Sequence, residues 1–289
     1  MIMTDVTQHD LPNPEQAIGV FDSGVGGISV LKHIHALLPN ESLIYAADSQ
    51  HAPYGNKSME DIRARCFAMA DFLITHQVKA IVVACNTATA AAINAMRDRY
   101  SIPIIGMEPA VKPAVAATKN GIIGVLATVG TLQSAQFAAL LASYGKEVQV
   151  VTQGCPGLVE CVEKGALEAP ETLTLVKQYC QPLMDAGADT IVLGCTHYPF
   201  LVPLIREVVG HHVTLIETGD AVAKQLHHRL DDAHALNSFG LSLDQLNPAI
   251  SIWTNSLQPY AHDVITHLWQ ANAQEKACIS KQALTIHSF

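Results

Sequence analysis

The chain has 289 residues and carries 17 basic against 26 acidic side chains, a formal charge of −9 that disfavours a phosphate-binding surface for nucleic acid. Hydrophobic residues make up 49% and charged residues 15%, so the chain can fill a large core and is not disordered. No apolar run is long enough to span a bilayer, and the first ten residues lack the features of a secretory signal. We therefore expect a cytoplasmic protein of two domains, with neither a nucleic-acid nor a membrane partner.

Seven cysteines are spread along the chain without a C-x-x-C pair. An odd number in a chain of this length indicates neither a disulfide framework nor a zinc ribbon. The pairs His211-His212 and His227-His228 give little support for a metal, because adjacent side chains point apart on a helix. We expect no metal site and mostly buried cysteines.

Short apolar runs alternate with stretches of helical periodicity. The first predicted strand, 18–21, leads through a Gly-rich turn into a helix that ends before Pro39, and the strand 43–47 follows. Apolar residues then recur at steps of three and four from Met59 to Leu73, which predicts a helix capped by Ser58. Further strands are predicted at 80–84, 102–106, 122–127, 147–151, 190–194 and 213–217, with helices after Cys85 and at 134–144, 170–186 and 199–209.

This alternation predicts the α/β class, with two pseudo-symmetric three-layer α/β/α domains, mainly parallel sheets and an active site in the cleft between them. We expect residues 15–108 together with 219–270 to form the first domain, which is discontinuous in sequence, and 109–218 to form the second. Residues 1–14 and 271–289 are predicted to be loose termini.

An internal repeat supports two related units. Segment 18–23 is similar to 123–128, an offset of 123 − 18 = 105, and segment 80–87 is similar to 190–197, an offset of 190 − 80 = 110. Because two separate segments give nearly the same offset, duplication is favoured over chance. Each unit then presents one cysteine, Cys85 or Cys195, at an equivalent place.

Both cysteines fall where a predicted strand ends and a helix begins. Ligands of open α/β sheets bind at the carboxyl ends of strands, and a helix N-terminus favours a thiolate. A single cysteine between a strand and a helix is more often a buried core residue. Polar residues follow both Cys85 and Cys195, however, where a core would have apolar ones.

Two thiols in equivalent places suit racemisation, in which one removes a proton from a carbon and the other returns one to the opposite face. Asp22 and His197 are candidates to set their protonation states, although spacing alone fits a turn cap and a loop histidine equally well.

Four motifs in this order resemble bacterial glutamate racemase over residues 18–269. They are Asp-Ser-Gly-Val-Gly-Gly-Ile-Ser-Val at 22–30, Pro-Tyr-Gly at 53–55, Ala-Cys-Asn-Thr-Ala at 84–88 and Gly-Cys-Thr-His-Tyr-Pro at 194–199. The resemblance implies a cofactor-independent proton transfer that interconverts L- and D-glutamate, the latter for peptidoglycan precursors.

The resemblance also assigns roles by position. It implies that Cys85 and Cys195 are the catalytic thiols, assisted by the acid Asp22 and the imidazole of His197. Implied substrate contacts are Asp22, Ser23, Tyr54, Gly55, Asn86, Thr87, Thr196 and His197. Thr131 is a further candidate. The family has one more acidic residue near the second thiol. Glu163 is the better-placed candidate for its counterpart and Glu160 the other, and the choice between them stays open.

Other functions are open on the sequence alone. Gly24-x-Gly26, with Asp48 lying 48 − 26 = 22 residues beyond Gly26, is a weak dinucleotide fingerprint, because Ser29 stands where glycine or alanine is expected. That alternative is an NAD-dependent oxidoreductase. Two further alternatives are a racemase of aspartate or another small acid and an amino-acid-binding protein without catalysis.

A homodimer is expected from the resemblance, but its mode is not. The sequence predicts neither activation by a cell-wall precursor nor a role in binding a topoisomerase. Residues 253–256 and the tail after Trp269 match the family only loosely.

Overall fold

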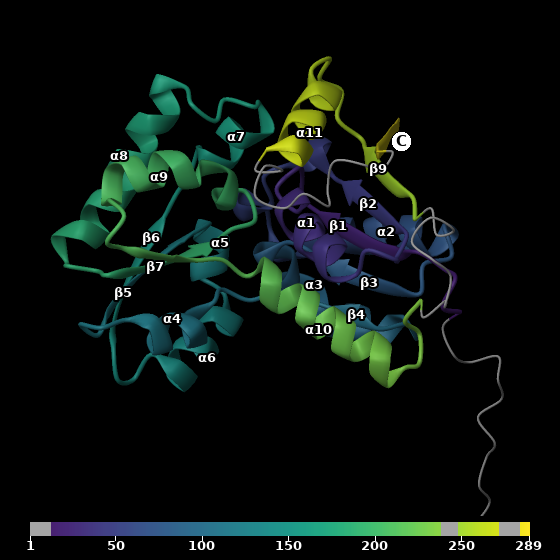
Figure 1. Ribbon diagram of the computed structural model, residues 1–289, viewed down its shortest axis with the longest axis horizontal. Helices are drawn as coiled ribbons and strands as arrows, with labels where there is room; N and C mark the ends of the chain where they lie inside the picture. Colours follow the sequence, from purple (N-terminus) through teal and green to yellow (C-terminus); the bar gives the residue numbers. More distant parts are fainter. Residues whose placement is uncertain (1–12, 238–247, 272–283) are drawn as a thin grey trace, which may run out of the picture.

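The computed structural model describes residues 13–237, 248–271 and 284–289, and the predicted loose leader lies almost entirely outside these. Two parallel sheets lie side by side, each with helices on both faces (Figure 1). The predicted α/β class with two mainly parallel sheets is confirmed. We call each sheet with its helices the first and the second unit.

The first unit holds a six-stranded sheet in the order β10-β9-β2-β1-β3-β4. Every neighbouring pair is parallel. The strands are β1 (Ile18–Asp22), β2 (Leu43–Ala47), β3 (Ala80–Val83), β4 (Ile104–Ile105), β9 (Ile250–Thr254) and β10 (Leu284–Ser288).

The second unit holds a four-stranded parallel sheet in the order β6-β5-β7-β8. Its strands are β5 (Ile122–Ala127), β6 (Gln149–Gly154), β7 (Thr190–Gly194) and β8 (Thr214–Ile216). This order matches β2-β1-β3-β4 of the first sheet, strand for strand. The internal repeat therefore has a counterpart in the topology, with β5 in the place of β1 and β7 in the place of β3.

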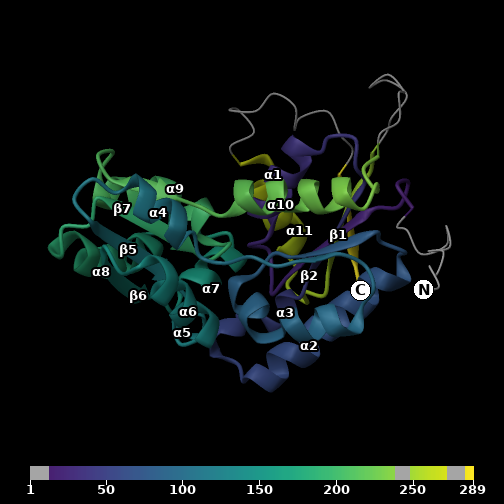
Figure 2. The same cartoon turned by 90° about the horizontal axis from the view of Figure 1, so that it is seen from below.

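Helices cover both faces of each sheet (Figure 2). Around the first sheet, one face packs against α1 (Ile28–Leu37), α10 (Gly219–Asp232) and α11 (Ala261–Gln270), and the other against α2 (Met59–Thr75) and α3 (Asn86–Arg99). Around the second sheet, one face packs against α4 (Val111–Ala117) and α6 (Ala135–Tyr144), and the other against α7 (Leu158–Glu163), α8 (Pro170–Asp185) and α9 (Val202–Val209). Short helices, α5 (Val129–Leu132) and the 3₁₀ turns Ser49–His51, Tyr54–Asn56 and Tyr198–Leu201, lie in the connections.

Side-chain caps fix the start of several helices. Ser58 caps α2 as predicted, since its Oγ accepts the Asp61 N–H at 3.1 Å. Thr128 and Ser134 cap α5 and α6 in the same way. These caps place the connections that follow β2 and β5, the part of the fold from which the site is built.

The C-terminal segment differs from the expectation of a loose end beginning at residue 271. Residues 284–288 form β10, which pairs in parallel with β9. The rings of His287 and Trp253 stack with centroids 4.2 Å apart, and those of Phe289 and Phe72 stack at 4.5 Å. Alternating apolar residues and aromatic stacking thus make this segment a strand.

Across the described ranges, every helix is too short or too polar to cross a membrane. The same ranges hold no group of three metal-binding side chains.

Candidate active site

A cavity lies between the two units at the carboxyl ends of the strands. Its walls come from the connections after β1, β2 and β3 on one side and after β5, β6 and β7 on the other. Lining residues are Ser23, Pro53, Tyr54, Gly55, Cys85, Asn86, Thr87, Thr128, Val159, Gly194, Cys195, Thr196 and His197. The structure thus brings the implied catalytic and substrate-contact residues together, except that Asp22 lies directly behind this lining. The further candidate Thr131 does not line the cavity and contacts it only through Thr87 and Thr128.

Cys85 is the N-cap of α3. Its Sγ accepts the Ala88 N–H at 3.5 Å and lies 3.8 Å from Ser23 Oγ. Burial, together with the nearby charge of Asp22, raises the pKa of the Cys85 thiol well above its ordinary value, and the Ala88 N–H offsets this only in part. The prediction that the helix N-terminus lowers this pKa is therefore wrong, because desolvation outweighs the helix.

Cys195 follows β7 and forms a pair with an imidazole. Its Sγ lies 3.7 Å from His197 Nδ1, and His197 Nε2 lies 2.7 Å from Glu163 Oε1. Burial acts to lower the pKa of His197, but its contacts with Cys195 and Glu163 prevail and raise that pKa well above its usual value. The second thiol therefore lies beside a buried imidazole that favours its own protonated form, the imidazolium.

Asp22 ends β1 and is fully buried. Its Oδ2 accepts the Thr196 hydroxyl at 2.9 Å and its Oδ1 accepts the Ser23 hydroxyl at 3.0 Å. Burial raises the pKa of this carboxyl, against the influence of His197 and Thr196. Asp22 reaches Cys85 through Ser23, so it can act on the first thiol from behind the cavity wall.

Glu163 is the acidic residue at the second thiol, which settles the choice that the sequence leaves open between it and Glu160. Besides His197, its carboxylate accepts the Val25 N–H at 2.7 Å and the Ser49 hydroxyl at 3.0 Å. Glu163 stands at the end of α7 in the second unit, whereas Val25 and Ser49 belong to the first.

Three threonine hydroxyls form a cluster at the N-terminus of α5. Thr87 Oγ1 lies 2.9 Å from Thr128 Oγ1 and 3.2 Å from Thr131 Oγ1, and the hydroxyls of Thr128 and Thr131 lie 2.9 Å apart. Thr128 is missing from the sequence-based candidates, although the internal repeat aligns it with Ser23. Hydroxyls of this kind and the N-terminus of α3 are suited to hold a carboxylate.

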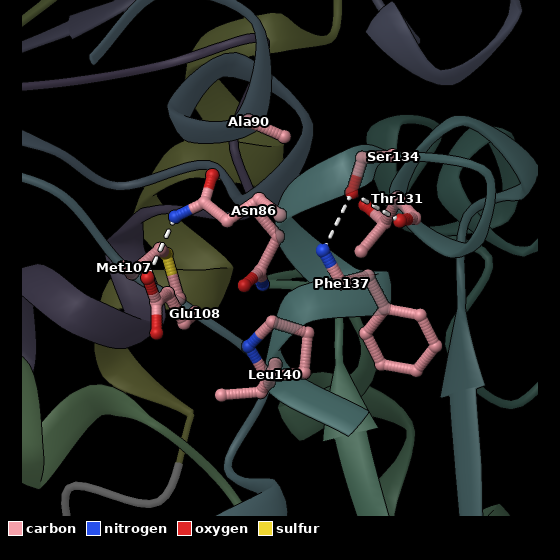
Figure 3. A pocket seen from close by; sticks show the side chains of 10 residues that line it. Asn86, Ala90, Met107, Glu108, Thr131, Ser134, Phe137 and Leu140 are labelled. Atoms are coloured by element: carbon pink, nitrogen blue, oxygen red, sulfur yellow. Dashed lines mark hydrogen bonds between the residues drawn. The ribbon is translucent and has the colours of Figure 1, made fainter. Parts of the chain in front are cut away.

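Asn86 lies on the boundary between two cavities. It lines the cavity of the thiols and also a neighbouring one, whose wall includes Phe137 and Glu108 (Figure 3). Asn86 is 5% exposed, and neither of its amide atoms has a hydrogen-bond partner among the described residues. A buried amide without protein partners is suited to bind a polar ligand in the cavity of the thiols.

The Gly-rich turn after β1 accommodates side chains of the second unit. A Cβ atom on Gly24 would lie 1.9 Å from Glu163 Oε1, and one on Gly26 would lie 2.2 Å from His197 Nδ1. These glycines are required for the close approach of two acid–base side chains. Since those side chains fill the place where a pyrophosphate would approach the turn, the dinucleotide alternative is not supported.

Asp48 holds the Pro-Tyr-Gly loop in place. Its buried carboxylate accepts two hydrogen bonds from Arg65, at 2.7 and 2.8 Å, and others from the Tyr54 hydroxyl and the Asn255 amide, each at 2.5 Å. Burial acts to raise the pKa of Asp48, but these donors prevail and lower it. With its oxygens occupied in this way, Asp48 is a structural anchor for Tyr54 and not a ribose ligand.

Comparison with known proteins agrees with this geometry. The model of the Asp/Glu/hydantoin racemase family matches residues 18–226. The glutamate racemase of Ectopseudomonas mendocina is 60% identical over 226 residues, which cover 78% of this chain and 86% of that protein. A crystal structure of a glutamate racemase isoform from Bacillus anthracis is similar with a TM-score of 0.79 and 34% identity, covering 96% and 98% of the two chains.

The glutamate racemase of Francisella tularensis in complex with D-glutamate is similar with a TM-score of 0.77 and 28% identity, covering 96% and 97%. The family model spans well over half of this chain, and a close relative is aligned over most of its length. The chain therefore belongs to the Asp/Glu/hydantoin racemase family.

Proposed function

We propose that this protein is a glutamate racemase, which interconverts L- and D-glutamate in the cavity between its two units. The observation that carries the proposal is the pair of thiols. Cys85 and Cys195 follow equivalent strands of the two sheets, line one cavity, and each has its own acid–base partner nearby. Relatives named for glutamate at 50–60% identity support glutamate over aspartate as the substrate.

The proposed reaction exchanges one proton for another. The thiolate of one cysteine removes the α-proton, which leaves a carbanion delocalised into the α-carboxylate, and the thiol of the other cysteine donates its proton to the opposite face. No electrons are transferred, so the step requires no redox cofactor. Afterwards the two sulfurs have exchanged protonation states, and the enzyme is set for the reverse direction.

The surrounding groups serve the two thiols separately. In this proposal Asp22, through Ser23, acts on Cys85, while His197, held by Glu163, stabilises the thiolate of Cys195. The hydroxyls of Thr87, Thr128 and Thr196 and the amide of Asn86 line the space that remains for the ligand's carboxylates and ammonium group.

Replacing either thiol tests the proposal. For Cys85→Ser and Cys195→Ser we expect kcat for interconversion, followed by optical rotation from each enantiomer, to fall by about 10²–10⁴-fold, because a hydroxyl is a much weaker acid than a thiol. Cys66→Ala, at a buried thiol on α2, is the matched control and keeps its activity. Full interconversion by either serine variant would exclude the two-thiol mechanism.

Proton exchange in heavy water gives a second measurement. Each enantiomer should form product that carries deuterium at the α-carbon, without added cofactor. The D-glutamate would supply peptidoglycan synthesis in the cytoplasm. A homodimer stays a prediction, and sedimentation equilibrium of the purified chain would test it.

A further inference from the structure

Two serine hydroxyls of the first unit reach across to the groups around the second thiol. Ser49, in the 3₁₀ turn after β2, donates to Glu163 Oε2 at 3.0 Å. Ser29, on α1, lies 2.8 Å from the carbonyl oxygen of Thr196. Neither side chain lines the cavity, so neither touches a substrate there.

Ser49 acts on the carboxylate that holds His197. Oε1 of Glu163 accepts the Val25 N–H and contacts His197, each at 2.7 Å, while Oε2 is held by Ser49. The terminal torsion of a glutamate is soft, so one contact alone does not fix the plane of the carboxylate. The first unit holds one oxygen by its backbone and the other by Ser49, and thereby sets the orientation of the group that orients the imidazole.

Ser29 acts on the peptide next to His197. Its single proton is shared between the carbonyl oxygens of Thr196 and Gly26, each 2.8 Å away. The hydroxyl of Thr196 in turn donates to Asp22. Thr196 is thus held at its backbone and at its side chain by the opposite unit, and His197 is the next residue along the chain.

We propose that Ser49 and Ser29 are positioning residues that hold the Cys195–His197 pair in place from the opposite unit. The second acid–base pair is then complete only where the two units meet, whereas Cys85, Ser23 and Asp22 all belong to the first unit. The inference rests on the proposed racemase function and deepens it.

A racemase offers a test that separates the two thiols. The equilibrium constant between enantiomers is one, so any variant must change kcat/KM equally in both directions. A defect confined to Cys195 is visible instead in the α-deuterium isotope effect, because it makes the proton transfer at Cys195 more rate-limiting. The α-deuterium isotope effect on kcat/KM should rise for the enantiomer from which Cys195 removes the proton. It should fall for the other enantiomer, from which Cys85 removes the proton.

The variants are Ser49→Ala and Ser29→Ala, with Ser143→Ala, at an exposed serine on α6, as the control. We expect kcat/KM to fall about tenfold in each test variant, as for loss of a hydrogen bond to a charged or buried acceptor. Isotope effects should move in opposite directions for the two enantiomers, and Ser49→Thr, which keeps the hydroxyl, should recover most of the activity. Ser143→Ala should match the wild type.

The pH profile adds a readout that general destabilisation would not change. The titratable groups facing His197 are Cys195, Glu163 and Asp22. Since contact with Glu163 helps to raise the pKa of His197, a misplaced carboxylate in Ser49→Ala should lower it. The alkaline limb of kcat/KM, on which His197 loses its proton, then moves to lower pH.

Values of kcat/KM within twofold of the wild type, or isotope effects that move together for both enantiomers, would overturn the inference. If the wild type itself does not interconvert glutamate, the proposed function fails instead, and the same assay distinguishes the two outcomes.

Discussion

Asp48 and Asp71 each accept two hydrogen bonds from an arginine, but their surroundings differ. The side chain of Asp48 is 0% exposed and also binds Tyr54 and Asn255. Asp71 also accepts the Tyr100 hydroxyl, but the Asp71 and Arg99 side chains are each about half exposed, at 49% and 48%. Removing a buried charge leaves its partners unsatisfied, while an exposed pair is replaced by water. Burial therefore decides how much each pair contributes to stability.

We predict that Asp48→Asn lowers the free energy of unfolding in urea by about 2–3 kcal/mol, and the control Asp71→Asn by less than about 1 kcal/mol. Equal losses in the two variants would contradict this reasoning. Because Asp48 anchors the Tyr54 hydroxyl, Asp48→Asn should also raise KM for glutamate.

The stabilisation by Asp48 should depend on pH. Its folded pKa is lowered, so the contribution is complete above the unfolded value of about 3.9 and is lost as the pH falls through the folded pKa. The difference in unfolding free energy between wild type and Asp48→Asn should therefore shrink below about pH 4. A difference that stays constant down to pH 2 would show that the carboxylate charge is not its source.

At this scale the sequence predicts residue identities better than their properties. Cys85, Cys195 and His197 are found from their place after strands and from the resemblance. The raised pKa of Cys85 is not predicted, because desolvation of the thiol depends on side chains that the whole fold packs around it. Glu163 lies 34 residues from His197, and the sequence favours it over Glu160 without deciding between them.

Elements with strong periodicity lie close to their predicted bounds, and weak ones do not. The helix at 59–75 ends two residues beyond its predicted periodicity, and the strands β1, β5 and β7 agree with prediction to within about one residue. The predicted strand 102–106 is reduced to Ile104–Ile105, which follows Pro103, a residue without an N–H for the sheet. The edge strand β10 has only two apolar positions, Leu284 and Ile286, and this short alternation becomes a strand through its pairing with β9.

The stacking of His287 on Trp253 should contribute to the attachment of β10. In a double-mutant cycle with His287→Ala and Trp253→Ala, we expect a coupling energy of about 0.5–1.5 kcal/mol in the free energy of unfolding. Thr285→Ala, at an exposed position of the same strand, should show no coupling to Trp253→Ala. Zero coupling for His287 would mean that backbone pairing alone holds the strand.

At the scale of the whole molecule, the repeat and the strand alternation predict two similar sheets, and the matching strand orders agree with them. How the units meet cannot be read from the sequence, because it depends on contacts between residues far apart in the chain. One apolar cluster runs from Val20 and Tyr45 of the first sheet to Leu193 of the second sheet and to Tyr198 in the turn that follows it. The division into domains at 108–109 and 218–219 remains a prediction.

This shared cluster predicts how the chain unfolds. Separating the units would expose apolar side chains of both, so neither unit keeps a complete core alone. We expect one calorimetric transition, with the calorimetric and van't Hoff enthalpies in agreement, and no stable fold for the isolated segment 109–218 by circular dichroism. The first-sheet face under α2 and α3 and the second-sheet face under α4 and α6 have apolar clusters of their own. Amide hydrogen exchange in these two faces therefore serves as an internal reference for each unit. Two resolved transitions, or a folded segment 109–218, would show that the units are independent domains whose shared cluster adds little to the stability of either.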